Sequence, residues 1–221
     1  MIAIISDVHG NYEALKKVLE KIDSMNISEI YCLGDVAGYY SQINECCDVL
    51  RKRNVRCVMG NHDWYMVSGS KCLRSHSVND CLKYQCKIIS KENFKWIASF
   101  PVIINAHEVS MVHGGWQNPI DEYLEVSLEY FNDIEGKLFL SGHTHVQCLC
   151  QYGTKMYCNP GSVGQPRDGD NRAAFATFNG ERFELYRVEY NIKKVGELMQ
   201  EAGFEKYYYG CLMDASKHLH K

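Results

Sequence analysis

The sequence predicts an α/β fold in which two packed, mixed β-sheets are flanked by helices. Residues 1–60 alternate short apolar runs with amphipathic stretches, in the strand–helix–strand–helix–strand order that is typical of a parallel sheet. Residues 102–190 instead contain short apolar runs separated by glycine, asparagine or proline, which indicates a mostly antiparallel or mixed sheet. We therefore expect each half of the chain to contribute one sheet of a single domain.

The individual elements follow from the spacing of apolar residues. A buried strand over 2–5 ends at Ser6-Asp7, and Asn11 is a suitable N-cap for the helix that follows. The region 64–100 is largely helical in character. The other predicted strands are 29–33, 54–59, 102–105, 108–112, 137–140, 146–151, 155–158, 172–178 and 182–190, and the predicted helices are 12–25, 43–50, 78–89, 92–100 and 192–202.

Composition limits the possible partners and the cellular location. A net charge of -3 and a pI near 6.3 argue against a basic nucleic-acid surface, so we expect no stable nucleic-acid binding. No apolar run approaches the roughly 20 residues that span a membrane. Met1 leads directly into the first strand without a secretory leader, so we expect a cytoplasmic protein whose 11 cysteines are reduced and pack as small apolar residues. The expected organisation is one domain over 1–203 and a C-terminal tail over 204–221.

Five polar clusters follow predicted strands, and together they form the main functional signal. Each cluster alone has an ordinary explanation as a turn or a helix cap. Together they supply five histidines, three aspartates and an asparagine, which is costly to gather at strand ends without a catalytic purpose. The clusters are Asp7-Val8-His9, Gly34-Asp35, Gly60-Asn61-His62-Asp63, Val112-His113-Gly114 and Gly142-His143-Thr144-His145.

The donor types in these clusters indicate a transition-metal site. Mixed nitrogen and oxygen donors suit manganese, iron, zinc, nickel or cobalt better than calcium or magnesium. The clusters contain no cysteine, which disfavours a structural zinc site. An aspartate can bridge two metal ions, and a two-metal site can clamp the oxygens of an in-line displacement at phosphorus.

The order D-x-H, G-D, G-N-H-D, V-H-G and G-H-T-H resembles the calcineurin-like metallophosphoesterase superfamily, whose fold is a four-layer αββα sandwich. The segments 34–39 and 159–168 further resemble small prokaryotic members of the YfcE type. The resemblance implies two divalent metal ions, with manganese as the first choice. One metal would be held by Asp7, His9, Asp35 and His145, and the other by Asp35, Asn61, His113 and His143.

The resemblance also implies a mechanism. A hydroxide between the metals would attack phosphorus in line, and His62 would protonate the leaving oxygen or stabilise the transition state. The expected enzyme is a phosphodiesterase or phosphatase for small, nucleotide-like substrates. One alternative is a serine/threonine protein phosphatase, although Gly34-Asp35-Val36-Ala37-Gly38 lacks the G-D-x-x-D-R-G pattern of that class. The other is a non-catalytic scaffold, although such scaffolds have lost histidines that are present here.

Several further residues have two interpretations. Asp63 either orients His62 or caps a helix, and Arg167 either contacts a phosphate or is a solvated loop residue, which we prefer. Aromatic side chains beside the motifs either stack on a leaving group or pack against the rim; they are Tyr39, Tyr40 and Trp116. The tail residues 207–209 are either an interface in a homo-oligomer or a docked terminus. His218 and His220 are expected to be solvated.

Overall fold

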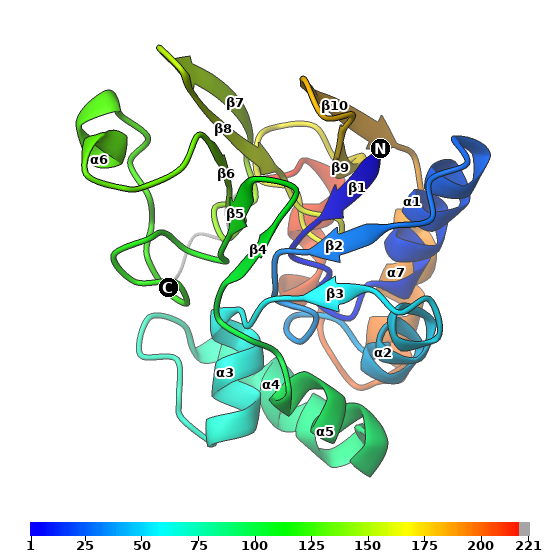
Figure 1. The fold of residues 1–221 in the computed structure, drawn as a ribbon. Helices are drawn as coiled ribbons and strands as arrows, with labels where there is room; N and C mark the ends of the chain where they lie inside the picture. The colour runs from blue at the N-terminus through cyan, green and yellow to red at the C-terminus, as the bar shows by residue number, and fades with distance from the viewer. Residues whose placement is uncertain (217–221) are drawn as a thin grey trace.

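Two five-stranded β-sheets pack face to face in the computed structural model, which describes residues 1–216 (Figure 1). The first sheet has the order β10-β9-β1-β2-β3, formed by Phe183–Val188, Ala173–Phe178, Ile2–Ile5, Ile30–Cys32 and Arg56–Cys57. The second has the order β4-β5-β6-β8-β7, formed by Ile104–Ala106, Val109–Met111, Leu138–Leu140, Lys155–Pro160 and Gln147–Tyr152. Both sheets contain parallel and antiparallel pairs, as predicted.

Helices cover the outer faces of both sheets. The first group, α1, α2 and α7, lies beside the first sheet, and α3, α4 and α5 extend from the end of β3 (Figure 1). The short helix α6 packs against the second sheet through Phe131, which stacks on Phe139. The predicted four-layer arrangement is therefore confirmed. The helices are α1 Tyr12–Ser24, α2 Ile43–Lys52, α3 Asn61–Ser68, α4 His76–Ile88, α5 Lys91–Ala98, α6 Leu128–Asn132 and α7 Ile192–Glu201.

The distribution of strands corrects one prediction. The expectation that each half of the chain builds one sheet is wrong, because β9 and β10 join the first sheet, where β9 pairs antiparallel with β1. All six residues of β9 are buried, as expected for a strand between two neighbours. The apolar run predicts that strand but contains no information on its partner. Helix α6 was not predicted, because its five residues are too few to show a helical period.

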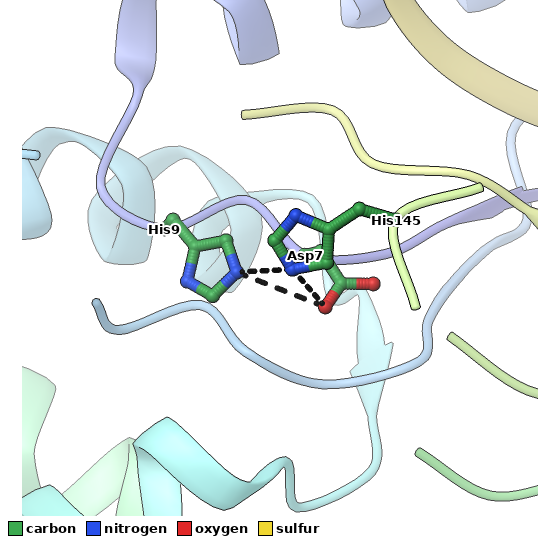
Figure 2. A group of neighbouring side chains, drawn as sticks. All are labelled: Asp7, His9 and His145. Atoms are coloured by element: carbon green, nitrogen blue, oxygen red, sulfur yellow. Dashed lines mark hydrogen bonds and ion pairs between the residues drawn. The ribbon is translucent and has the colours of Figure 1, made fainter. Parts of the chain in front are cut away.

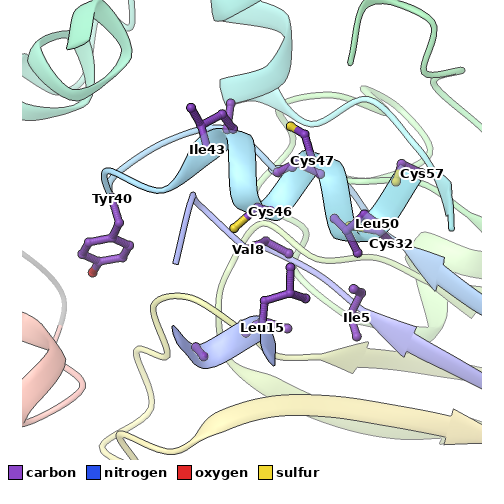
Figure 3. Packing of buried hydrophobic residues seen from close by; sticks show 14 of the residues in the cluster. Ile5, Val8, Leu15, Cys32, Tyr40, Ile43, Cys46, Cys47, Leu50 and Cys57 are labelled. Atoms are coloured by element: carbon purple, nitrogen blue, oxygen red, sulfur yellow. The ribbon is translucent and has the colours of Figure 1, made fainter. Parts of the chain in front are cut away.

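The hydrophobic core has two main layers. Residues such as Ile4, Leu33 and Met111 fill the space between the sheets. On the other face of the first sheet, Ile5, Val8 and Leu15 pack with residues of α2 beneath the helices (Figure 3). Eight of the 11 cysteines are buried and all 11 are free thiols, so most of them pack as core residues. Figure 3 shows four of them, Cys32, Cys46, Cys47 and Cys57, around α2.

The chain after α7 continues as two short 3-10 helices, η1 Lys206–Tyr208 and η2 Gly210–Met213. Both contact α7, and the buried side chain of Leu212 belongs to the core beneath the helices. His218 and His220 lie outside the described residues. Over residues 1–216, no helix is long and apolar enough to span a membrane.

Candidate metal centre

The strand-end motifs converge at one edge of the sandwich because the strands before them are parallel neighbours. β1 pairs with β2 and β2 with β3, while β5 pairs with β6, so within each sheet the carboxyl ends meet. The first group of converging side chains, here called the first triad, consists of Asp7, His9 and His145 (Figure 2). His145 Nε2 lies 3.2 Å from Asp7 Oδ1 and 3.0 Å from His9 Nε2. All three side chains are buried.

A second group lies beside the first. The second triad consists of Asp35, His113 and His143, all buried. His113 Nε2 lies 3.4 Å from Asp35 Oδ2 and 3.2 Å from His143 Nδ1. Asn61 joins this group, with its Oδ1 atom 3.1 Å from His113 Nε2. All seven predicted metal ligands are therefore brought together.

Asp35 lies between the two triads. Its Oδ2 atom is 3.8 Å from His9 Nε2 in the first triad and 3.4 Å from His113 Nε2 in the second. The other oxygen, Oδ1, accepts a hydrogen bond from the backbone N–H of His62 at 2.8 Å. One carboxylate oxygen is thus fixed by the start of α3 while the other faces histidines of both groups. Asp35 is therefore the carboxylate that lies between the two groups.

Backbone carbonyls orient three of the histidines. The Nδ1 atom of His9 lies 2.9 Å from Ala37 O, that of His113 lies 2.6 Å from Leu33 O, and that of His145 lies 2.6 Å from Gln165 O. A carbonyl only accepts hydrogen bonds, so each Nδ1 must carry the proton. In the neutral ring, each Nε2 atom presents a lone pair to the cluster, as in metal-ligating histidines. Burial alone would lower the pKa of His113, but Asp35 outweighs it and raises the pKa to about 10, so this ring must release a proton when a metal binds.

The donor set fits a divalent cation. The lone pairs of His9 and His145 face each other across 3.0 Å, and Asp7 Oδ1 beside them has no hydrogen-bond partner. Three facing lone pairs repel one another unless a cation lies between them. Burial alone would raise the pKa of Asp7, but His145, His113 and the Ser6 hydroxyl outweigh it and hold the pKa at about 2. Burial also holds the pKa of His9 well below its usual value, so the first triad favours the ionised carboxylate and neutral imidazole that bind metals.

The site is held in uncommon backbone conformations. Five predicted ligands have left-handed φ angles, which cost energy in non-glycine residues and concentrate at functional sites. They are Asp7 (53°), His9 (54°), Asp35 (55°), His143 (66°) and His145 (60°). Glycine permits the close approach of the loops: a Cβ atom on Gly60 would lie 2.1 Å from Asp35 Oδ1. The glycines beside the motifs therefore have a steric role.

His62 lies beside the metal-ligand cluster at the start of α3. Its ring is 4.7 Å from that of His9 and 5.0 Å from that of Tyr39, between ring centroids. Its Nδ1 atom is buried without a hydrogen-bond partner, and its Nε2 atom is 3.9 Å from Asp35 Oδ2. Burial lowers the pKa of His62 to about 4. The ring therefore has hydrogen-bonding capacity that the protein itself does not use.

Asp63 contacts backbone rather than the His62 ring. Its carboxylate accepts hydrogen bonds from the backbone N–H groups of Asp35 (2.8 Å), Ala37 (2.9 Å) and Gly60 (3.2 Å). The contact with Gly60 is that of a helix-capping residue, so the capping interpretation fits the geometry. Burial raises the pKa of Asp63 to about 7, and the neighbouring Asp35 adds to the effect. Asp63 thereby ties the second and third motif loops together.

Arg167 points toward the site instead of into solvent. Its side chain is half-buried, and its Nη2 atom donates to Tyr39 Oη at 2.9 Å. Its Nε atom donates to Gln165 Oε1 at 3.1 Å, and its guanidinium lies 5.5 Å from the centroid of the Tyr39 ring. Within residues 1–216 it forms no ion pair with a carboxylate. The preferred expectation of a solvated loop arginine is wrong, because two neighbouring side chains hold the guanidinium in place.

The three aromatic residues that the sequence places beside the motifs, Tyr39, Tyr40 and Trp116, have different positions in the structure. Tyr39 lines the site between His9 and His62, whereas Tyr40 is fully packed and accepts from Gln165 Nε2 at 2.9 Å. Trp116 packs on Phe139 of the second sheet, with ring centroids 5.0 Å apart, and its Nε1 atom donates to Ser110 Oγ. Tyr40 and Trp116 therefore support the structure around the site.

Sequence reasoning missed the loop that covers His143. The ring of Tyr123 lies 4.1 Å from that of His143 between centroids, and Asp121 Oδ1 lies 3.7 Å from His143 Nε2. Asp121 in turn pairs with Arg74. No glycine–histidine pattern marks residues 117–123, so the sequence contained no signal for this contact.

Comparisons with known proteins agree with this geometry. The family model described as the calcineurin-like phosphoesterase superfamily domain matches residues 1–181. The uncharacterized protein MJ0912 of Methanocaldococcus jannaschii is 39% identical over 89% of this chain and 90% of its own length. The crystal structure of a metallophosphoesterase from Sphaerobacter thermophilus superposes with a TM-score of 0.85, at 30% identity, covering 97% of this chain and 98% of the other.

A third relative matches only part of the chain. The symmetrical bis(5'-nucleosyl)-tetraphosphatase of Haemophilus ducreyi is 23% identical over 51% of this chain and 44% of its own length. The superfamily predicted from the order of motifs is thus confirmed by a family model that covers most of the chain. The chain belongs to the calcineurin-like phosphoesterase superfamily and is a metal-dependent phosphoester hydrolase.

Proposed function

We propose that the protein is a phosphodiesterase for small, nucleotide-like substrates that uses two divalent metal ions. The observation that carries the proposal is the pair of adjacent triads with Asp35 between them. Asp7, His9, Asp35 and His145 would hold one metal, and Asp35, Asn61, His113 and His143 the other. When bound, the ions would activate water as the nucleophile and neutralise the charge that develops on the phosphoryl oxygens. Manganese is the first choice, with iron, zinc, nickel and cobalt as alternatives.

His62 would act on the substrate and not on a metal. Its unpartnered Nδ1 atom and its position between His9 and Tyr39 support a contact with a phosphoryl or leaving-group oxygen. A hydrogen bond or a proton from the imidazole would stabilise charge on that oxygen in the transition state. The backbone N–H of His62 donates to Asp35 Oδ1, so the same residue helps to orient the shared carboxylate.

Arg167 would bind a non-bridging oxygen of the substrate. Its guanidinium has no carboxylate partner within residues 1–216 and is already oriented by Tyr39 and Gln165. An oriented guanidinium loses little freedom when it binds a phosphate, and its charge-assisted hydrogen bonds are strong. The relative from Haemophilus ducreyi, named as a bis(5'-nucleosyl)-tetraphosphatase, supports a nucleotide-like substrate.

Hydrolysis of two chromogenic esters tests the proposal. The purified protein is stripped of metal by chelation and assayed with bis-p-nitrophenyl phosphate and p-nitrophenyl phosphate, each with and without Mn²⁺. We expect Mn²⁺-dependent turnover with a higher kcat/KM for the diester. Symmetrical dinucleoside polyphosphates, assayed beside a serine phosphopeptide, then test substrate class. Turnover of the phosphopeptide alone would favour a protein phosphatase instead.

The control for this assay is His107→Ala, which changes an exposed histidine that pairs with Glu29 and lies in none of the motifs. This variant should behave as the wild type. If the protein binds Mn²⁺ and still hydrolyses neither ester nor any dinucleoside polyphosphate, the proposal is wrong.

A further inference from the structure

The ring nitrogen of His143 that points away from the cluster lacks the backbone partner that the other three predicted histidine ligands have. His9, His113 and His145 each place Nδ1 on a backbone carbonyl. His143 instead faces the cluster with Nδ1, which lies 3.2 Å from His113 Nε2. Its Nε2 atom therefore points outward, and that atom is buried without a hydrogen-bond partner. A neutral ligating His143 would carry its proton on this atom and would leave the N–H unsatisfied.

The acceptor facing this nitrogen is the carboxylate of Asp121. Its Oδ1 atom is 3.7 Å from His143 Nε2, which is longer than a hydrogen bond by well under 1 Å. Two further contacts hold the carboxylate: Oδ1, the oxygen that faces His143, also accepts from Arg74 Nη2, and Oδ2 accepts from Tyr65 Oη at 3.4 Å. Asp121 is only 26% exposed, so it is screened from water on one side. Both the placement and the charge of Asp121 suit an acceptor for an imidazole N–H.

The backbone fixes Asp121 relative to the second triad. The N–H groups of His113 and Gly114 both donate to Pro119 O, at 3.1 and 2.8 Å. Asn118 Oδ1 accepts from the backbone N–H of Asp121 at 3.2 Å, which closes the turn just before it. The loop that carries Asp121 is therefore attached to the same strand end that carries His113.

We propose that Asp121 accepts a hydrogen bond from Nε2–H of His143 and so positions this histidine as a ligand of the metal at the second triad. Arg74 orients Asp121 in turn, which makes Arg74, Asp121 and His143 a chain from the surface to the metal. This inference rests on the proposed function, because it requires a metal at the second triad. Partners of this kind raise the basicity of the imidazole and fix its orientation.

Metal binding by substituted chains tests the inference. Metal-free wild type, Asp121→Asn and Asp121→Ala are titrated with Mn²⁺ by calorimetry in competition with a chelator of known affinity. We expect one of the two equivalents of Mn²⁺ to bind about 10–100-fold more weakly in Asp121→Ala and the other to be unchanged. Asp121→Asn, which keeps an acceptor oxygen but loses the charge, should show a smaller loss. Circular dichroism checks that each variant is folded.

The matched control is Asp23→Asn. It removes the carboxylate of Asp23 on helix α1, which forms an ion pair with Arg53. It should leave both binding steps unchanged. Equal weakening of both equivalents in Asp121→Ala, or no weakening in either Asp121 variant, would overturn the positioning role. A wild-type chain that binds fewer than two equivalents would overturn the proposed function itself and this inference with it.

Discussion

The two triads are built from similar side chains but are supported differently. In the first triad, both histidines are fixed by backbone carbonyls, Ala37 O and Gln165 O, within packed motif loops. In the second triad, only His113 is fixed in this way, by Leu33 O. His143 faces Asp121, a side chain on a loop that the motifs do not include. A backbone acceptor survives any side-chain substitution, whereas a side-chain acceptor does not, so the second triad is the more vulnerable to mutation.

The largest expected effect comes from removing Asp35, the carboxylate that lies between the two triads. Asp35→Ala removes the oxygen that faces His9 and His113 and the acceptor for the His62 backbone N–H. Metal ions supply several kcal/mol of transition-state stabilisation, so kcat/KM should fall on the order of 10³-fold or more. Metal analysis should show that both ions are lost or weakened. The control Asp133→Ala changes an exposed aspartate at the end of α6 and should leave kcat/KM and the metal content unchanged. If Asp35→Ala retains two tightly bound ions, Asp35 is not a ligand of both metals.

A smaller effect is expected when a side chain acts on substrate alone. His62→Ala should lower kcat by about 10²–10⁴-fold, because in the proposed mechanism it removes the imidazole that would contact a reacting oxygen. Both triads should keep their metals, since His62 is not among the proposed ligands. Steady-state kinetics and metal content, measured on the same preparation, check both parts. Loss of one metal equivalent together with the activity would instead make His62 a ligand.

Arg167 should affect binding more than rate. Arg167→Ala would remove the proposed charge-assisted hydrogen bond to the substrate, worth about 1.5–3 kcal/mol, so KM should rise about 10–100-fold with a much smaller change in kcat. Arg167→Lys keeps the charge but loses the planar guanidinium that Tyr39 and Gln165 orient. Its KM should lie between that of the wild type and that of Arg167→Ala. An unchanged KM for both variants would place the phosphate elsewhere.

The smallest effect is expected at Trp116, which packs outside both triads. Trp116→Phe removes the hydrogen bond to Ser110 Oγ and part of the contact with Phe139. The free energy of unfolding should fall by about 1–2 kcal/mol, as measured by urea denaturation. The kinetic constants should match the wild type. A raised KM would mean that the indole contacts substrate after all.

Sequence reasoning was most successful where chemistry and periodicity coincide. The motifs at Asp7, Asp35 and His113 each follow a strand, and parallel pairing brings such strand ends together, so the cluster itself could be predicted. The atoms that orient the side chains of the cluster could not be predicted. Ala37 O and Gln165 O are backbone atoms, which leave no trace in a pattern of side chains.

Long-range contacts were the other limit of prediction. The run that forms β9 has the same local character whichever sheet it joins, so its pairing with β1 was not accessible. Arg167 was expected in solvent because it lies in a predicted loop, whereas its orientation depends on Tyr39, far away in the sequence. In each case the deciding partner lies in a distant segment.

Metal stoichiometry tests the central claim most directly. The metal-free wild type and the variants His9→Ala and His143→Ala are dialysed to equilibrium against Mn²⁺. The number of bound metal ions per chain is then measured by inductively coupled plasma mass spectrometry. The proposed pair of metal positions, with Asp35 between them, predicts two ions per wild-type chain and about one ion per chain in each variant. One ion or none in the wild type, or loss of both ions from either variant, would contradict two separate metal positions.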